Sequence, residues 1–359
     1  MTHGTENSGP PSISCCASSD ALKWVCNLIF RLQPKNERLK DNEVAYIIGS
    51  GNYTGTETSE WANNETKKFL YYSYRDHFTP LENGTTTDTN WGCMIRSGQM
   101  MLACAFMRFF NSGNARIDDE HIQELRGKTQ FFFADIPSAP FGVHAMSSEG
   151  VNHGVPCGKW FGPTPLAKTL SSLSARYLST GGEGPVVLSL SDRLVSTAQV
   201  MKLLQESKHV VLLIPVMVGV GLISDKYAQV LLRSLEMESS IGILGGRRSS
   251  ALYLYGHQGN RIFCLDPHYT QRAFISPEST GTLTSARRTL SVTSCDTSMA
   301  FGFYIASVEG FEVFQKDLAE ANSQLTFPLI SVVADEGSVS GESEVDDCLF
   351  APRKELTEK

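Results

Sequence analysis

Apolar residues recur with helical spacing in some segments and form short continuous runs in others, so the chain is expected to contain both helices and strands. Helices are predicted at 162–177, 196–207 and 310–322. In the first of these, Thr164 is the expected N-cap and Pro165 the first helical residue. The predicted strands are short apolar runs at 185–191, 209–216 and 301–306.

The segment ALYLYGHQGNRIFCLDPH, residues 251–268, predicts two further strands joined by the turn GHQGN, which places His257 in a hairpin turn. Most of the predicted strands therefore lie in the second half of the chain. No internal repeat is present. This arrangement indicates an α+β or α/β fold and excludes a repeat protein or an all-β protein.

The segment NWGCMIRSGQMMLACAF predicts a buried helix whose first turn carries Cys93. The preceding loop offers three N-cap candidates, Asp88, Thr89 and Asn90. Unpaired N–H groups and the helix dipole favour an anion at a first turn, so a thiol there loses its proton more easily. Because the thiolate is the nucleophilic form, the position suggests catalysis. A structural thiol is the alternative, since free cysteine behaves as a small apolar residue.

A nucleophilic cysteine needs a base, and His268 is the best candidate. It lies in FCLDPHYTQ, directly after a predicted strand, with Asp266 two positions before it and Pro267 between them. Proline keeps the preceding residue extended, so the two side chains project to the same side. A carboxylate beside an imidazole orients the ring and stabilises its charged form. The alternative is a strand-end turn that Asp266 caps.

The two ends of the chain differ from the central region. We assign residues 1–42 to an N-terminal extension that is partly disordered and holds a short helix at 21–33. Residues 335–359 are expected to form an acidic, disordered tail. The remaining residues, 43–334, are expected to form the folded domain.

Charge and cysteine content narrow the possible functions. The net charge of −7 and the pI of about 5.7 argue against a nucleic-acid-binding protein. Nine cysteines at irregular spacing fit neither a disulfide framework nor a metal site, so we expect a reducing compartment and no metal or cofactor. The longest apolar run, 210–223, is too short to span a bilayer, and no signal segment is evident. A cytoplasmic protein is the expectation.

Six segments together resemble the autophagins, the cysteine proteases that process the ubiquitin-like modifier of autophagy. The resemblance covers roughly Val44 to Val333 and includes the blocks YYSYRDHFTPL, DTNWGCMIRSGQMML, GKWFGPTPLAKTL, IGILGGRRSSALYLYG, FCLDPHYTQ and SMAFGFYI. It implies an α+β, papain-like fold with a small additional subdomain. It also implies a monomer that cleaves a GABARAP-type modifier after its C-terminal glycine and releases the modifier from phosphatidylethanolamine on membranes.

The resemblance also implies roles for individual residues. Cys93 matches the family's nucleophile, His268 its general base and Asp266 the group that orients the base. Tyr74 matches the tyrosine that helps to form the oxyanion hole, a role that a phenolic O–H suits as a donor. From the residue type alone, Tyr74 is one of several candidate core tyrosines.

Three more positions correspond to the substrate channel of the family. Trp160 matches the tryptophan that covers the channel for glycine, although by itself it would be taken for a core aromatic residue before a helix. Gly245 and Gly246 match the start of a gating loop. The chain departs from many members at three positions, Asn90, Ser97 and Arg248.

Two other functions stay open at this stage. A relative that only binds the modifier would act as an adaptor, and a cysteine-dependent acyltransferase or amidase would use the same three groups on small molecules. The intact Cys93, Asp266 and His268 argue against the adaptor. The tail EVDDCLFAPRKELTEK lacks the aromatic-x-x-aliphatic motif with which many members bind the modifier, so a second contact there is not expected.

Overall fold

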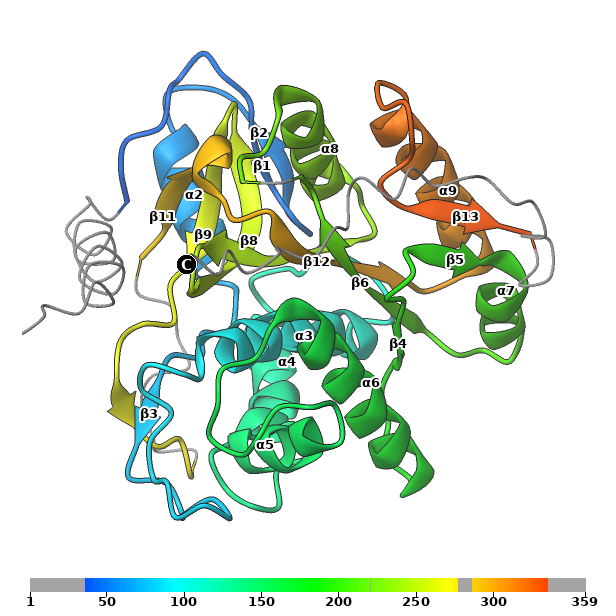
Figure 1. Cartoon of the computed structure of the whole chain (residues 1–359). Helices are drawn as coiled ribbons and strands as arrows, with labels where there is room; N and C mark the ends of the chain where they lie inside the picture. The colour runs from blue at the N-terminus through cyan, green and yellow to red at the C-terminus, as the bar shows by residue number, and fades with distance from the viewer. Residues whose placement is uncertain (1–35, 220, 277–285, 335–359) are drawn as a thin grey trace, which may run out of the picture.

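The structure is a computed structural model that describes residues 36–219, 221–276 and 286–334 (Figure 1). The helix predicted at 21–33, most of the N-terminal extension and the acidic tail 335–359 lie outside these ranges. In the described part of the chain, no helix has the length and apolar character that crossing a bilayer requires.

A mixed sheet forms the centre of the molecule, with the strand order β11-β9-β8-β7-β12-β6-β4 and with β1 and β2 added beside β8. All pairs are antiparallel except β4 with β6. The strands are β1 (Ala45–Ile47), β2 (Gly51–Tyr53), β4 (Val186–Ser189), β6 (Val210–Met217), β7 (Ser240–Arg247), β8 (Ser250–Gln258), β9 (Arg261–Leu265), β11 (Arg288–Ser291) and β12 (Ser298–Ile305).

Helices cover both faces of this sheet (Figure 1). Two adjacent residues of β12 point to opposite faces of the sheet. Gly302 lies against Met101 of α3. Phe303 packs on Phe314 of α9, with ring centroids 5.0 Å apart. On one side lie α3 (Cys93–Phe110), α4 (Ile122–Thr129), α5 (Val143–Val151) and α6 (Pro163–Ser179). On the other lie α8 (Asp225–Glu236) and α9 (Val308–Asn322). Covered strands need continuous apolar runs, as the sequence of β6 shows.

Short elements complete the fold. A parallel pair, β5 (Leu194–Ser196) with β13 (Ser331–Val333), and the helix α7 (Thr197–Gln205) form the small additional unit beside the main sheet (Figure 1). A second parallel pair joins β3 (Arg75–Asp76) to β10 (Gln271–Arg272). The remaining helical pieces are α2 (Thr58–Thr66) and the 3₁₀ turns Gln130–Phe133 and Val292–Ser294. The α+β, papain-like expectation is confirmed.

Local details differ from the prediction at three places. The N-cap of α6 is Gly162 rather than Thr164, and the first helical residue is Pro163 rather than Pro165, because Gly162 is the last extended residue. His257 lies in the buried strand β8, since the connection to β9 needs only residues 259 and 260. None of the three N-cap candidates before α3 caps it; the N-cap is Gly92, without a side-chain hydrogen bond.

Asp88 does not cap α3 because it belongs to a fully buried ion network. Arg96 donates from Nε to Asp88 Oδ2 at 2.6 Å and from Nη1 to Asp135 Oδ1 at 2.7 Å. Arg75 joins through its Nε, 3.9 Å from Asp135 Oδ2. Burial alone would lower the pKa of Arg96, but the two carboxylates raise it above its usual range.

The network connects three segments that are distant in sequence. The main-chain N–H of Arg75, in β3, donates to Asp88 at 2.5 Å, and Asp88 lies in the loop before α3. The N–H of Phe274, just after β10, donates to Asp135 at 2.8 Å. The beginning of α3 and the β3–β10 pair are therefore held in one fixed arrangement, because a buried charge that loses its partner is costly.

Removing the central cation of the network, as in Arg96→Met, should cost roughly 3–5 kcal/mol of unfolding free energy, because two buried carboxylates lose their partner. The matched control is Arg176→Met. Arg176 also lies in a helix and also pairs with a carboxylate, Glu149 at 3.5 Å, but its side chain is 56% exposed. The control should lose less than about 1 kcal/mol. Urea denaturation measures both, and equal losses would contradict the proposed importance of the network.

Candidate active site

Cys93 is the first residue of α3, as the sequence predicts, and its side chain is 1% exposed. The chain turns into the helix through Asn90, whose φ is +73°. A Cβ atom on Gly92 would lie 2.3 Å from the Asp88 carboxylate. Glycine is therefore required at position 92, because any side chain there would collide with Asp88 where it approaches the helix.

His268 follows β9 and lies against Asp266. The distance from His268 Nδ1 to Asp266 Oδ1 is 2.6 Å, and the same oxygen accepts the main-chain N–H of His268 at 3.0 Å. Both side chains are nearly buried. Asp266 therefore forms the contact that turn capping requires and also the contact that orients a ring, as the i, i+2 spacing predicts.

Tyr74 packs edge-on against the His268 ring, with ring centroids 5.4 Å apart at an interplanar angle of 86°. Its main chain bonds on both sides to the histidine segment, since Tyr74 N donates to Pro267 O and Tyr74 O accepts from Gln271 N, each at 2.9 Å. Tyr74 is buried, and its O–H lies close enough to the Cys93 thiol to lower the pKa of that thiol. The structure thus brings Tyr74, Cys93, His268 and Asp266 together.

Cys93, His268 and Asp266 each favour the ionised form of the group beside them. Burial alone would raise the pKa of the Cys93 thiol, but the hydrogen bond and charge of His268 lower it below its usual value. Burial alone would lower the pKa of His268, but its hydrogen bonds with Asp266 and Cys93 raise it to about 9. Burial likewise opposes ionisation of Asp266, yet His268 lowers the pKa of that carboxyl. The arrangement favours a thiolate beside an imidazolium.

Three neighbours of the site were not predicted from the sequence. Ser250 Oγ lies 3.2 Å from His268 Nε2, and the main-chain N–H of Ala251 lies close enough to the Cys93 thiol to lower its pKa. Arg288 Nε lies 3.5 Å from Asp266 Oδ2. Ser250 and Ala251 fall within a quoted family block, which is a signal that could have found them, but no local pattern points to Arg288.

Gly245 and Gly246 lie at the end of β7, opposite Leu252 and Ala251 of β8. Gly246 has a φ of +124°, and a Cβ atom there would lie 2.5 Å from Ser250 O. A Cβ atom on Gly245 would make only ordinary contacts, the nearest at 3.4 Å. The hairpin that these glycines begin returns through Ser250 and Ala251, so it reaches both His268 and Cys93.

Trp160 lies just before α6 and is 45% exposed, so it is not the core aromatic residue that the segment alone would suggest. The contacts that join Cys93, His268, Asp266 and Tyr74 do not include it.

The described cysteines, Cys93, Cys104, Cys157, Cys264 and Cys295, are all free thiols. Across residues 36–219, 221–276 and 286–334, no three His, Cys, Asp or Glu side chains are grouped as metal ligands. The position of His268 beside Cys93 can support nucleophilic attack by the sulfur, with His268 as the proton acceptor.

Comparison with known proteins agrees with this chemistry. Residues 59–317 match the Peptidase C54 catalytic domain. The chain is 36% identical to the probable cysteine protease atg4 of Schizosaccharomyces pombe over 280 residues, 74% of this chain and 80% of that protein. It is 28% identical to the cysteine protease ATG4A of Xenopus laevis over 335 residues, 82% of this chain and 83% of that one. The chain therefore belongs to the peptidase C54 family, the autophagins, whose members are cysteine proteases.

Proposed function

We propose that the protein is an endopeptidase with a Cys93–His268–Asp266 triad. The observation that carries the proposal is the position of His268, which bonds to Asp266 through Nδ1 at 2.6 Å and also interacts with the Cys93 thiol. One ring thus connects an acid to a nucleophile, which is the arrangement that triad chemistry needs.

The reaction follows from these positions. The Cys93 thiolate attacks the carbonyl carbon of the scissile bond, and the carbonyl oxygen becomes an oxyanion that the Tyr74 O–H stabilises. The His268 imidazolium gives its proton to the leaving amine as the C–N bond breaks, and a thioester remains. A water molecule, deprotonated by His268, then attacks the thioester, and the acid product and the thiolate are released.

The substrate that we propose is a ubiquitin-like modifier of autophagy of the GABARAP type, cut after its C-terminal glycine. The same cleavage would release the modifier from phosphatidylethanolamine. The similarity to proteins named ATG4 supports this substrate. Trp160, whose indole is exposed, is the residue that we propose covers the channel for the glycine. We place the catalytic domain at 43–334 and propose that it acts as a cytoplasmic monomer.

The hairpin between β7 and β8 limits access in this proposal. Cys93 is only 1% exposed, and Ser250 of this hairpin lies 3.2 Å from His268 Nε2. A peptide that reaches the thiol has to displace this hairpin. Gly245 and Gly246 begin the segment that would move, which is the role that we propose for them.

The central experiment combines a thiol-reactive probe with cleavage of the full-length modifier. We expect rapid labelling of Cys93 that His268→Ala slows at least about tenfold, because the imidazolium no longer favours the thiolate. Cys93→Ala should abolish cleavage while the far-UV spectrum and modifier binding persist. Cys157→Ala is the matched control and should leave cleavage unchanged. Cleavage that survives in Cys93→Ala would refute the proposal, and labelling without cleavage of the modifier would instead favour a small-molecule amidase.

Asp266→Asn tests the orienting acid. Asparagine caps a turn about as well as aspartate, so a capping role predicts unchanged turnover. If Asp266 orients His268, turnover should fall on the order of 10² to 10³, less than the about 10⁴ of a serine protease triad. The His268 imidazolium deprotonates as the pH rises through about 9, so the alkaline limb of kcat/KM should lie there and move to lower pH in the variant. Turnover within about threefold at normal stability would leave Asp266 as a cap only.

Gly246→Ala and Gly245→Ala form a matched pair for the hairpin. Alanine at 246 is strained by the positive φ and contacts the main chain, so we expect a loss of about 1–3 kcal/mol of unfolding free energy together with altered kcat/KM. Alanine at 245 should change stability by less than about 1 kcal/mol. Denaturant melts and modifier cleavage measure both, and indistinguishable variants would contradict a role for the Gly246 conformation.

A further inference from the structure

The proposed triad carries an excess of negative charge in the form that its geometry favours. Cys93 and Asp266 are anions in that form, and His268 supplies the one cation of the three. All three side chains are nearly buried. Because an uncompensated charge is costly away from water, a further cation is needed close to the triad.

The two oxygens of the Asp266 carboxylate have different surroundings. Oδ1 accepts from His268 twice, from the ring at 2.6 Å and from the main-chain N–H at 3.0 Å. Oδ2 is buried and has no hydrogen-bond donor within the described ranges, but Arg288 Nε lies 3.5 Å from it. Both side chains of this pair are 3% exposed, so their charges interact with little screening by water. Burial raises the pKa of Asp266, but the His268 contacts and the charge of Arg288 lower it below its usual value.

The other ionisable groups beside Asp266 do not supply this cation. The Tyr71 O–H donates to the main-chain oxygen of Asp266 at 2.6 Å, and Cys264 lies two positions before Asp266 on β9. Burial raises the pKa of both groups above their usual values, so both are neutral near pH 7. Arg75, on β3, lies near Tyr71 but is paired within the buried ion network. The charge that faces Oδ2 is therefore that of Arg288.

Two contacts fix Arg288 in this place. It begins β11, which pairs antiparallel with β9 and sets Arg288 opposite Cys264. Its Nη2 donates to the Tyr269 O–H oxygen, and its guanidinium lies over the Tyr269 ring, 5.6 Å from the ring centroid. Tyr269 directly follows His268 in the chain. Arg288 is thus attached to the segment that carries both the acid and the base.

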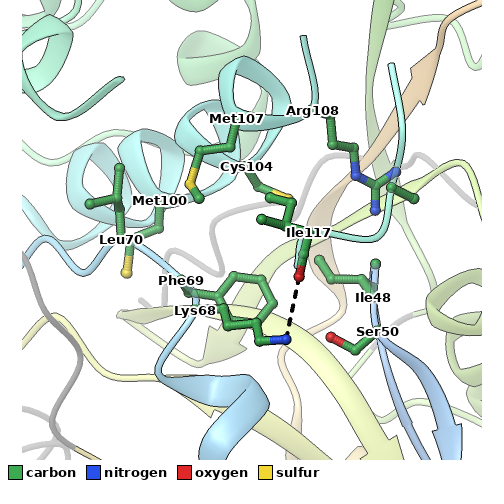
Figure 2. Close-up of a pocket in the computed structure, with 12 residues that line it drawn as sticks. Ile48, Ser50, Lys68, Phe69, Leu70, Met100, Cys104, Met107, Arg108 and Ile117 are labelled. Atoms are coloured by element: carbon green, nitrogen blue, oxygen red, sulfur yellow. Dashed lines mark hydrogen bonds between the residues drawn. The ribbon is translucent and has the colours of Figure 1, made fainter. Parts of the chain in front are cut away.

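Burial of an arginine does not by itself indicate a role in the active site. Arg108 lies near the end of α3, beside a small cavity (Figure 2), and is also buried. It donates to the main-chain oxygens of Glu238 at 2.9 Å and Ser240 at 2.6 Å, which hold the beginning of β7. Arg108 therefore supports the fold, whereas Arg288 lies against a carboxylate of the triad.

Arg287 provides the closest comparison, because it precedes Arg288 in the chain and is equally buried. Neighbouring residues of an extended chain point to opposite sides. Arg287 Nη2 donates to Glu37 O at 2.5 Å, and its guanidinium lies 5.0 Å from the centroid of the Phe263 ring. These contacts do not involve the triad, so Arg287 is a matched control for Arg288.

We propose that Arg288 is a positioning residue of the active site, which balances the charge of the triad and holds Asp266 with Oδ1 toward His268. The inference rests on the proposed triad and adds a residue to it. Arg288 does not touch the reacting atoms. It acts through the carboxylate, which in turn orients the imidazole.

The first test compares Arg288→Gln with Arg287→Gln in cleavage of the full-length modifier. In Arg288→Gln, kcat should fall at least about tenfold while KM changes less than about threefold, because the orientation of the base is lost and the substrate contacts remain. Arg287→Gln should keep kcat within about threefold of the parent. The urea midpoint should fall in both, since each loses a buried guanidinium. An unchanged kcat in Arg288→Gln, or equal losses in the two variants, would overturn the proposal.

The second test is the pH profile, which a purely structural role would not move. Without the cation, the buried and coupled groups of the triad bind a proton more readily. The acidic limb of kcat/KM should therefore move up by at least about 0.5 pH unit in Arg288→Gln. Arg288→Lys keeps the charge, so its limb should stay within about 0.2 pH unit of the parent, with kcat at least about fivefold above that of Arg288→Gln. An unmoved limb in Arg288→Gln, or equal shifts in the two variants, would contradict the role.

The third test is a double-mutant cycle, which also decides the case in which Arg288→Gln alone does not fold. Asp266→Asn removes the carboxylate through which Arg288 acts, so adding Arg288→Gln should lower kcat less than about threefold further. The double variant loses both charges of a buried pair, which proteins tolerate better than the loss of one. A further loss of about tenfold or more, or a double variant that does not fold, would give Arg288 a structural role and overturn the proposal.

The same cycle separates this inference from the proposed triad. If kcat of Asp266→Asn stays near that of the parent, the orienting acid itself is refuted. A large loss in Asp266→Asn together with an unchanged kcat in Arg288→Gln would refute only the role of Arg288.

Discussion

The arrangement of this protein depends on one buried ion network, in which Arg96 lies between Asp88 and Asp135. Each carboxylate also accepts a main-chain N–H, from Arg75 and from Phe274, so the charges are satisfied only when three distant segments meet. The pair β3–β10 is two residues long and could not be stable alone. Because an unpaired charge is costly inside a protein, the network joins these segments much more firmly than their short strands do.

The ion network lies under the N-terminal end of α3, where Cys93 is placed. Cys93 begins the helix and Arg96 follows one turn later, so the position of the thiol is tied to the charges beneath it. Tyr74 directly precedes β3, and His268 lies just before β10. The proposed nucleophile, base and oxyanion donor are therefore placed by the same contacts.

The site as described is closed. The thiol is buried although a nucleophile has to meet a peptide, and Ser250 lies against the His268 nitrogen that is not bonded to Asp266. A closed hairpin keeps the Cys93–His268 pair in a dry environment, where opposite charges interact strongly. This closed arrangement is compatible with the proposed specificity, because a bound modifier is large enough to hold the hairpin open, whereas a small reagent reaches the thiol only when the hairpin opens by itself.

The sequence by itself determined the elements whose signal is local. The apolar runs predicted β6, β12 and the two strands β8 and β9, and Cys93 was placed correctly at a helix start. The contact of Asp266 with His268 was predictable because the two residues are two positions apart across a proline. Only the tertiary structure decided that His268 meets Cys93, that Tyr74 among several tyrosines lies beside them, and that Asp88 pairs with a buried arginine instead of capping a helix. These contacts depend on the register and packing of distant segments, which no local periodicity encodes.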